Sequence, residues 1–254
     1  MPQLLLAVDT SGKNGSLALA RVAPGQGVET VEAVPLTGGA FSAQLVPQIA
    51  ALLLKHGYSK GDLGAFAVAS GPGSFTGLRV GLAAIKALAE ALHKPIVAIS
   101  LLEAIACSGS ERGRVLAVLD AGRRDLYVGD YEIDARDPAQ LHGNVPLQVD
   151  RHVPRHADMH SERLLSGKEF LADAGLYAGK LKAVITPDAA LAETFRASFQ
   201  ALGLRVELIE YPNSAVIAHL GWERLQRGQT VRPEELEANY IRQSDAEIFS
   251  KPAP

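Results

Sequence analysis

The chain has 254 residues and a mass of 26.9 kDa, which is enough for one large domain or two of ordinary size with a buried core. Hydrophobic residues make up 47% and charged residues 21%, and no apolar run approaches the roughly 20 residues that a bilayer-spanning helix needs, so we expect no contact with a membrane. The net charge of -3 argues against a protein that grips nucleic acid unaided, because binding to a phosphate backbone normally needs a concentrated positive field.

The amino-terminal residues and the cysteine content indicate a cytoplasmic protein. The start, MPQLLLAVDTSG, lacks the basic segment and the small-residue cleavage site of a signal peptide. The single cysteine, Cys107, excludes an internal disulfide and fits a reducing compartment. We interpret Cys107 as a small core residue rather than a nucleophile.

A strand-turn-strand unit occurs twice. The first copy is predicted at 4–22, with turn residues at 11–15 between two aliphatic strands, and its first strand runs into Asp9 and Thr10. The second copy is predicted at 115–133, with a strand that ends in Asp120 and a turn through Gly122, Arg123 and Arg124. Two copies of one unit predict two lobes of similar architecture, although hairpins that end in Asp are common.

The stretch from Ser70 to Arg79, SGPGSFTGLR, follows a predicted strand at 66–69 and opens a long helix. Its glycines permit positive φ and close backbone approach, and Ser74 or Thr76 can cap the helix. The amides of such a helix start can hold an anion. The spacing matches neither a Walker A string nor a dinucleotide fingerprint, so a purely structural tight turn is an equal alternative.

Two helices are predicted in the first half, at about Ser42 to His56 and Ser74 to His93, with Pro47 near the start of the first or kinking it. Both are more apolar than ordinary surface helices, since Ile49 through Leu54 is continuously apolar. One face can pack on a sheet, and the opposite face then needs another cover. The alternative is that both helices are buried within the fold.

The second half is less regular. The segment from about 135 to 179 is rich in turn formers and contains His152, His156 and His160, but Pro154 interrupts the helix that would align them, so a solvated segment is favoured over a metal site. Beyond it we predict a strand and helix in AVITPDAALAETFRASFQALG, a strand in LRVELIEYP, and a helix at about 214–227 that ends at a glycine.

The order of these elements resembles the two-lobed actin-like α/β fold of sugar kinases and Hsp70 ATPases, which is ribonuclease H-like. Specific strings, namely AVDTSGKNGSLAL, SGPGSFTGLRVGLAAIKALA, AVLDAGRRDLYVGDYE, YPNSA and EANYIR, resemble the bacterial TsaB (YeaZ) family. They run from the first strand to the tail, and only the middle stays unmatched. We expect an amino-terminal lobe at 1–104 with partner-binding helices and a second lobe at 105–254, whose late helix at about 214–227 packs back on the first lobe.

The resemblance implies a non-catalytic dimerization subunit that acts with TsaD, of which TsaB is a paralogue, and with the ATPase TsaE. In that family the complex transfers a threonylcarbamoyl group to the adenosine next to the tRNA anticodon. The chain would form a heterodimer with TsaD, or a homodimer when alone, and would meet tRNA only through the complex. It would require no cofactor of its own, with ATP and a metal on the partner subunits.

The resemblance also implies an interface made by a bundle of the two apolar helices. The expected interface residues are Phe41, Leu45, Ile49, Leu52, Leu53, Phe75, Gly77, Leu78, Gly81, Ala84, Ile85 and Leu88. On this basis Gly81→Arg or Ala84→Glu is predicted to abolish heterodimer formation without unfolding the monomer.

No catalytic or metal-binding residues are expected. The His-x-x-x-His pair of the TsaD-like members has no counterpart, since His56 and His93 lie far apart. The residues that could face a nucleotide or phosphate are Asp9, Thr10, Ser11, Gly71, Gly73 and Ser74. A polar turn retained for folding is the favoured interpretation of this hairpin.

The chain departs from the family at two positions. It has Phe41-Ser42 where the family often has His-Ser, and Ala238 where the tail motif has proline.

An independent actin-like ATPase or phosphotransferase is the main alternative function, with Asp9 and the 71–77 loop around the nucleotide. A glycoprotease is improbable without the metal pair. Arg123, Arg124 and Arg242 are candidate tRNA contacts, although exposed arginines are usually only solvated.

Overall fold

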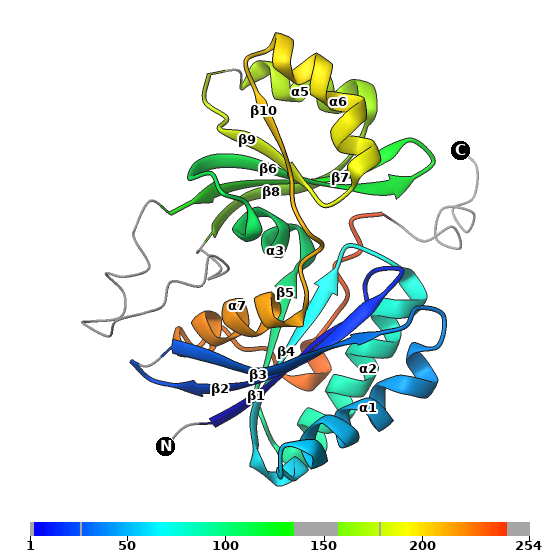
Figure 1. Cartoon of the computed structure of the whole chain (residues 1–254), viewed down its shortest axis with the longest axis vertical. Helices are drawn as coiled ribbons and strands as arrows, with labels where there is room; N and C mark the ends of the chain where they lie inside the picture. The colour runs from blue at the N-terminus through cyan, green and yellow to red at the C-terminus, as the bar shows by residue number, and fades with distance from the viewer. Residues whose placement is uncertain (1–2, 26, 135–156, 178, 243–254) are drawn as a thin grey trace.

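Two five-stranded sheets form the framework of the protein (Figure 1), seen in a computed structural model that describes residues 3–25, 27–134, 157–177 and 179–242. The first sheet has the strand order β3-β2-β1-β4-β5. Its strands are β1 (Gln3–Asp9), β2 (Gly15–Ala23), β3 (Gly27–Leu36), β4 (Leu63–Gly71) and β5 (Ile96–Ser100). The central strand β1 is antiparallel to β2 and parallel to β4.

The second sheet repeats this plan, with the strand order β10-β9-β6-β7-β8. Its strands are β6 (Gly113–Gly122), β7 (Asp125–Ile133), β8 (Ala157–Ser166), β9 (Ala183–Thr186) and β10 (Arg205–Leu208). Here too the central strand, β6, is antiparallel to the next strand in the chain and parallel to β9. The predicted duplication and the two-lobed actin-like fold are confirmed.

Helices cover both sheets (Figure 1). The α-helices are α1 (Phe41–Lys55), α2 (Phe75–Leu92), α3 (Leu101–Ser108), α5 (Gly167–Leu176), α6 (Ala189–Ala201) and α7 (Ser214–Gln226), and the short 3-10 helices are η1 (Lys60–Asp62) and η2 (Pro233–Glu235). α1 and α2 pack on the outer face of the first sheet, and α5 and α6 on that of the second. α3 and α7 lie between the sheets. None of the helices within the described ranges is long and apolar enough to cross a membrane.

The layer between the sheets is shared by the two lobes. One continuous apolar cluster joins Leu5 and Ala7 of the first sheet, Val115 of the second sheet, Leu102 of α3 and Ile217 of α7. α3 contacts β6, β7 and β8 as well as β4 and β5, whereas α7 contacts β1 to β5. Each half of the chain therefore covers the sheet of the other half with its last helix. The predicted division after residue 104 falls inside α3 rather than between two independent domains.

The sequence predicts the two outer helices to within one residue but misses several elements. β3, β5 and α3 were not predicted, and α3 is buried along seven of its eight residues, so it lacks the polar stripe that marks a surface helix. Cys107 lies on this helix and is buried in the shared apolar layer, which confirms its interpretation as a core residue.

An ion pair in the shared layer makes a testable contribution to stability. Arg224 of α7 donates to the Oε2 atom of Glu103 at 2.5 Å and to the carbonyl of Ala98 at 2.7 Å. Glu103 is 3% exposed, and burial raises its pKa although Arg224 opposes the shift. A carboxyl whose pKa is raised by folding destabilises the folded state progressively as the pH rises above its unfolded pKa.

We expect Arg224→Met to lower the free energy of unfolding by about 3 kcal/mol, the low end for a broken buried pair because Arg224 stays partly exposed. The loss should be larger at pH 7.5 than at pH 5, because protonation of Glu103 removes the uncompensated charge. Urea unfolding of the parent and the variant at both pH values measures this loss in the free energy of unfolding. Glu103→Gln in the Arg224→Met background should recover much of the loss at pH 7.5, and an equal loss at both pH values would contradict the assignment.

Candidate interlobe cavity and docking face

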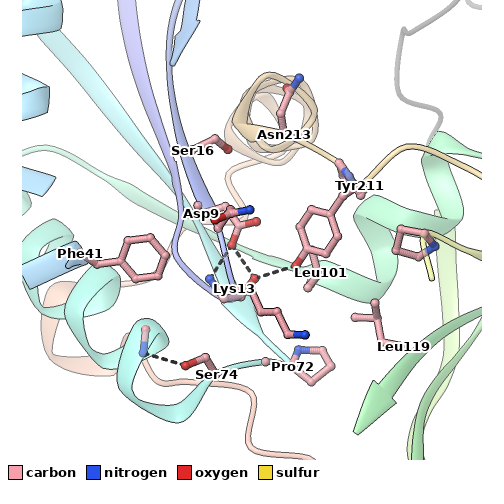
Figure 2. A pocket seen from close by; sticks show the side chains of 18 of the residues that line it. Asp9, Lys13, Ser16, Phe41, Pro72, Ser74, Leu101, Leu119, Tyr211 and Asn213 are labelled. Carbon is pink, nitrogen blue, oxygen red and sulfur yellow. Dashed lines mark hydrogen bonds between the residues drawn. The ribbon is translucent and has the colours of Figure 1, made fainter. Parts of the chain in front are cut away.

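A cavity of about 1120 Å³ lies between the lobes (Figure 2). Its walls come from turns and helix starts of both sheets. The lining residues are Asp9, 11–16, 33–35, Gly39, Phe41, Ser42, 72–74, Thr76, Gly77, Val80, Leu101, 119–122, Tyr127, 187–189 and 211–213. Of the predicted nucleotide-facing residues, Asp9, Ser11, Gly73 and Ser74 line the cavity, whereas Thr10 and Gly71 do not.

Both hairpins enter the cavity with the same local hydrogen bond. The Oδ1 atom of Asp9 accepts from the backbone N–H of Ser11 at 2.8 Å and from its hydroxyl at 2.5 Å. In the second lobe Asp120 Oδ1 accepts from the N–H of Gly122 at 2.8 Å. Asp9 is buried, and this burial raises its pKa despite the hydrogen bonds from Ser11. The Asp9 carboxylate thus closes its own turn, as expected of a polar turn retained for folding.

The glycine-rich turn packs directly on the first hairpin. Thr10 Oγ1 donates to the carbonyl of Gly77 at 2.8 Å, and the N–H of Ser74 donates to the carbonyl of Ser11 at 2.7 Å. A Cβ atom on Gly73 would lie 2.3 Å from the Ser11 carbonyl oxygen, and one on Gly77 would lie 2.1 Å from that of Thr10. These glycines are therefore required for close packing, which favours the structural interpretation of the turn.

Three helices begin at the cavity. Their N-cap side chains are Ser74 for α2, Asp188 for α6 and Asn213 for α7, and each accepts a hydrogen bond from a backbone N–H in its own first turn. Lys13 and Tyr211 also line the cavity, with the Tyr211 hydroxyl 3.5 Å from Ser11 Oγ (Figure 2). The positive charge of Lys13 and the amino-terminal ends of several helices favour the binding of an anion in the cavity.

The second-lobe wall of this cavity was not predicted from the sequence. A signal for part of it exists in the strings TPDAA and YPNSA, where a proline and a capping Asp or Asn follow a strand in both cases. The repeat of this pattern marks the starts of α6 and α7, at Asp188 and Asn213, which both line the cavity. Asp188 belongs to the second lobe, whereas Asn213 begins a helix whose Ser214 is bonded to Ser16 of the first sheet.

The described residues contain no group of three or more His, Cys, Asp or Glu side chains that could hold a metal ion. His160 lies on β8 with its Nε2 atom 4.0 Å from Glu132, and both side chains are about half exposed. His152 and His156 lie outside the described residues.

Most of the expected interface residues face the interior of the first lobe, which corrects their assignment. The buried side chains of α1 pack against β2, β3 and α2, and those of α2 join the same apolar cluster. The residues that are buried in this way are Phe41, Leu45, Ile49, Leu52, Leu53, Leu78 and Ile85, and Gly77 and Gly81 are buried against Thr10. They cannot be reached by a partner while the lobe is folded.

The opposite sides of the same helices form an exposed surface of mostly small and apolar residues. We call this surface the outer face and define it by Val46, Ala50, Leu54, Ala83 and Ala87. Val46 is 56% exposed and Leu54 79%. Phe75 is 40% exposed, and Ala84 and Leu88 are half-buried beside the outer face, so these three expected interface residues remain accessible.

Comparison with known proteins places this architecture in a family. The family model described as "TsaD: tRNA N6-adenosine threonylcarbamoyltransferase" matches residues 35–249. The chain belongs to this family. Within it, similarity is to the TsaB (YeaZ) members, as predicted from the sequence motifs.

Two curated relatives carry the name tRNA threonylcarbamoyladenosine biosynthesis protein TsaB. The protein of Bacillus subtilis (strain 168) is 34% identical over 129 residues, which are 50% of this chain and 55% of the relative. The protein of Escherichia coli (strain K12) is 31% identical over 134 residues, which are 51% and 55%. The chain spans about half the length of the curated relatives that it matches.

A solved structure shares the fold of the whole chain. YeaZ from Pseudomonas aeruginosa has a TM-score of 0.65 and 20% sequence identity, and the match covers 94% of this chain and 99% of that one. This likeness extends across both lobes.

Proposed function

We propose that the chain is a non-catalytic dimerization subunit in the biosynthesis of tRNA threonylcarbamoyladenosine, and that it binds a TsaD-type subunit through the outer face of α1 and α2. The observation that carries the proposal is the apolar outer face itself, in a chain of the TsaB family. Burial of apolar surface favours association at roughly 25 cal/mol per Å², although only the surplus over the cost of association appears as affinity.

A non-catalytic role is supported by the cavity. The Asp9 carboxylate is buried and bonded within its own turn, where it accepts two hydrogen bonds from Ser11. The transfer to adenosine therefore belongs, in this proposal, to the TsaD partner, with TsaE as the ATPase of the complex. ATP and a metal would be held by those subunits, and this chain would require no cofactor.

The outer face would join two copies of this chain in a homodimer when no partner is present, since the same apolar surface would otherwise stay in water. tRNA would be met only through the complex, which agrees with the net charge of -3. Such a subunit would work in the cytoplasm.

Reconstitution tests the proposed function. The purified chain is mixed with TsaD and TsaE of the same organism, a source of threonylcarbamoyl adenylate, and unmodified tRNA, and the modified nucleoside is measured by mass spectrometry. We expect modification only when all three proteins are present. Equal modification without this chain would overturn the proposal.

A nucleotide-dependent enzyme is the second candidate, favoured by the three helix starts and Lys13 at the cavity. Calorimetry of the single chain with ATP and Mg²⁺ distinguishes a nucleotide-dependent enzyme from a dimerization subunit. Tight binding and turnover that are both reduced by Asp9→Ala would favour the enzyme, whereas turnover that appears only after TsaD and TsaE are added would favour the subunit.

A further inference from the structure

The tail segment at 236–242 crosses from the first lobe to the second. It begins next to η2, where Leu236 is 1% exposed and packs in the apolar cluster of α1, α2 and the first sheet. Just before it, the N–H of Val231 donates to the carbonyl of Ile96 on β5 at 2.9 Å. The start of this segment is thus fixed to the first lobe, and we call residues 236–242 the strap.

The strap next contacts the glycine-rich turn and the start of α2. The N–H of Asn239 donates to the carbonyl of Ser70 at 2.7 Å. The ring of Tyr240 lies 5.3 Å from that of Phe75, and its hydroxyl accepts a hydrogen bond from Arg79 at 3.2 Å. The guanidinium of Arg79 in turn lies 3.7 Å from the centre of the Phe75 ring. These contacts hold the strap against the glycine-rich turn and the start of α2, next to residues 72–74, which line the cavity.

The end of the strap is bonded to the second lobe. Arg242 donates to the carbonyl of Ala121 at 2.7 Å and to Asp125 Oδ2 at 2.6 Å, both at the β6–β7 turn. Asn239 Nδ2 donates to Glu162 of β8 at 2.5 Å, and Glu162 also accepts from the hydroxyls of Ser100 and Tyr131. Arg242 is therefore engaged with its own chain, which argues against its role as a tRNA contact.

The strap is bonded beside the interlobe cavity on both lobes, since Ser70 and Phe75 flank the lining residues 72–74 in the chain and Ala121 lines the cavity itself. Residues 72–74 line the cavity from the first lobe, and Ala121 and Gly122 line it from the second. In Figure 1 the strap, drawn in red-orange, runs along the side of the molecule that carries the β6–β7 turn, whereas α3 and α7 connect the lobes toward the other side. The apolar layer can therefore act as a hinge, and the strap, whose Ile241 packs against the edge of that layer, can act as a tie.

We propose that the strap is an interlobe tie that fixes the width of the cavity, and that its release lets the lobes open about the layer of α3 and α7. The bonds that Arg242 makes to the second lobe are polar and partly exposed, with side-chain exposures of 23% for Arg242 and 29% for Asp125. Such partly exposed polar bonds can break more readily than the buried contacts of the shared apolar layer, which suits a tie that opens. This inference does not depend on the partner of the outer face.

Spin labels on opposite lobes test the tie. Lys60→Cys on η1 and Leu176→Cys on α5 place labels at exposed sites, and Cys107 is buried, so labelling is confined to the introduced cysteines. Distances are measured by pulsed electron resonance in the full chain, diluted with unlabelled protein so that only distances within one chain contribute. The strap variant is Asn239→Ala with Arg242→Ala.

We expect the strap variant to shift the label distance or broaden its distribution, and Asp125→Ala to do the same to a smaller extent. Arg196→Ala is the matched control, because Arg196 forms an exposed ion pair with Glu193 on α6, far from the strap. A distribution unchanged from the parent in the strap variant, with circular dichroism showing that it is folded, would overturn the proposal. A shift of equal size in the control would overturn it as well.

Discussion

Gly81→Arg is expected to unfold the first lobe rather than to block a partner. A Cβ atom at this position would lie 2.3 Å from Thr10 Oγ1, well inside contact distance, and the helix is held there by the bond from Thr10 to Gly77. The guanidinium would also be placed in a buried setting without a partner. We expect a loss of about 4 kcal/mol or more in the free energy of unfolding, among the largest effects of single substitutions.

Ala83→Arg is the matched control for this prediction, because Ala83 lies two residues further along α2 on the exposed side. It should change the free energy of unfolding by no more than about 0.5 kcal/mol. Thermal and urea unfolding of both variants and the parent measure the difference. A stably folded Gly81→Arg protein would contradict the close packing of Gly81 of α2 against Thr10.

The same Ala83→Arg substitution, and Ala50→Glu on α1, are expected to weaken binding to a TsaD partner by about 100-fold or more. Each places a charge in the centre of the outer face, and a buried charge without a counter-charge costs about 3 kcal/mol or more. Because the lobe itself stays folded, the loss appears in the affinity alone. This prediction rests on the proposed function.

Titration calorimetry with purified TsaD measures these affinities, and sedimentation measures the homodimer. Arg196→Ala on α6 serves as a control, since it alters an exposed ion pair of the second lobe. If Ala83→Arg and Ala50→Glu both bind TsaD as the parent does, the outer face is not the docking surface. If they break the homodimer but not the heterodimer, the two assemblies use different surfaces.

The sequence predicts the fold better than it predicts which helix faces are buried. Both hairpins are recognisable because each strand ends in an Asp followed by turn residues, and α2 because Ser74 caps it. In α1, however, the run from 49 to 54 is apolar throughout, so composition does not separate the buried Leu52 and Leu53 from the exposed Leu54. Their burial depends on the rotation of the helix over the sheet, which only packing determines.

Only part of the cavity could be predicted, because its walls come from segments that lie far apart in the sequence. The first-lobe residues Asp9, Ser11 and Ser74 could be found, because they lie in two short polar motifs. The opposite wall comes from segments near 120 and 188, which the second sheet brings together, and the segment at 211–213 adds residues that lie beside the first hairpin. A single sequence does not show which distant segments come into contact. For the same reason it does not show that Gly73 and Gly77 pack closely against the first hairpin.

The exchange of the last helices between the two halves has a consequence for biosynthesis and for truncation. Residues 1–112 emerging from a ribosome contain the whole first sheet but lack α7, which covers its inner face, so Leu5 and Ala7 stay open to water until residue 226 has been made. The two lobes therefore fold cooperatively, and only after most of the chain has been synthesised. Cleavage of the chain between the repeats would yield two insoluble fragments that recover the native fold only when combined.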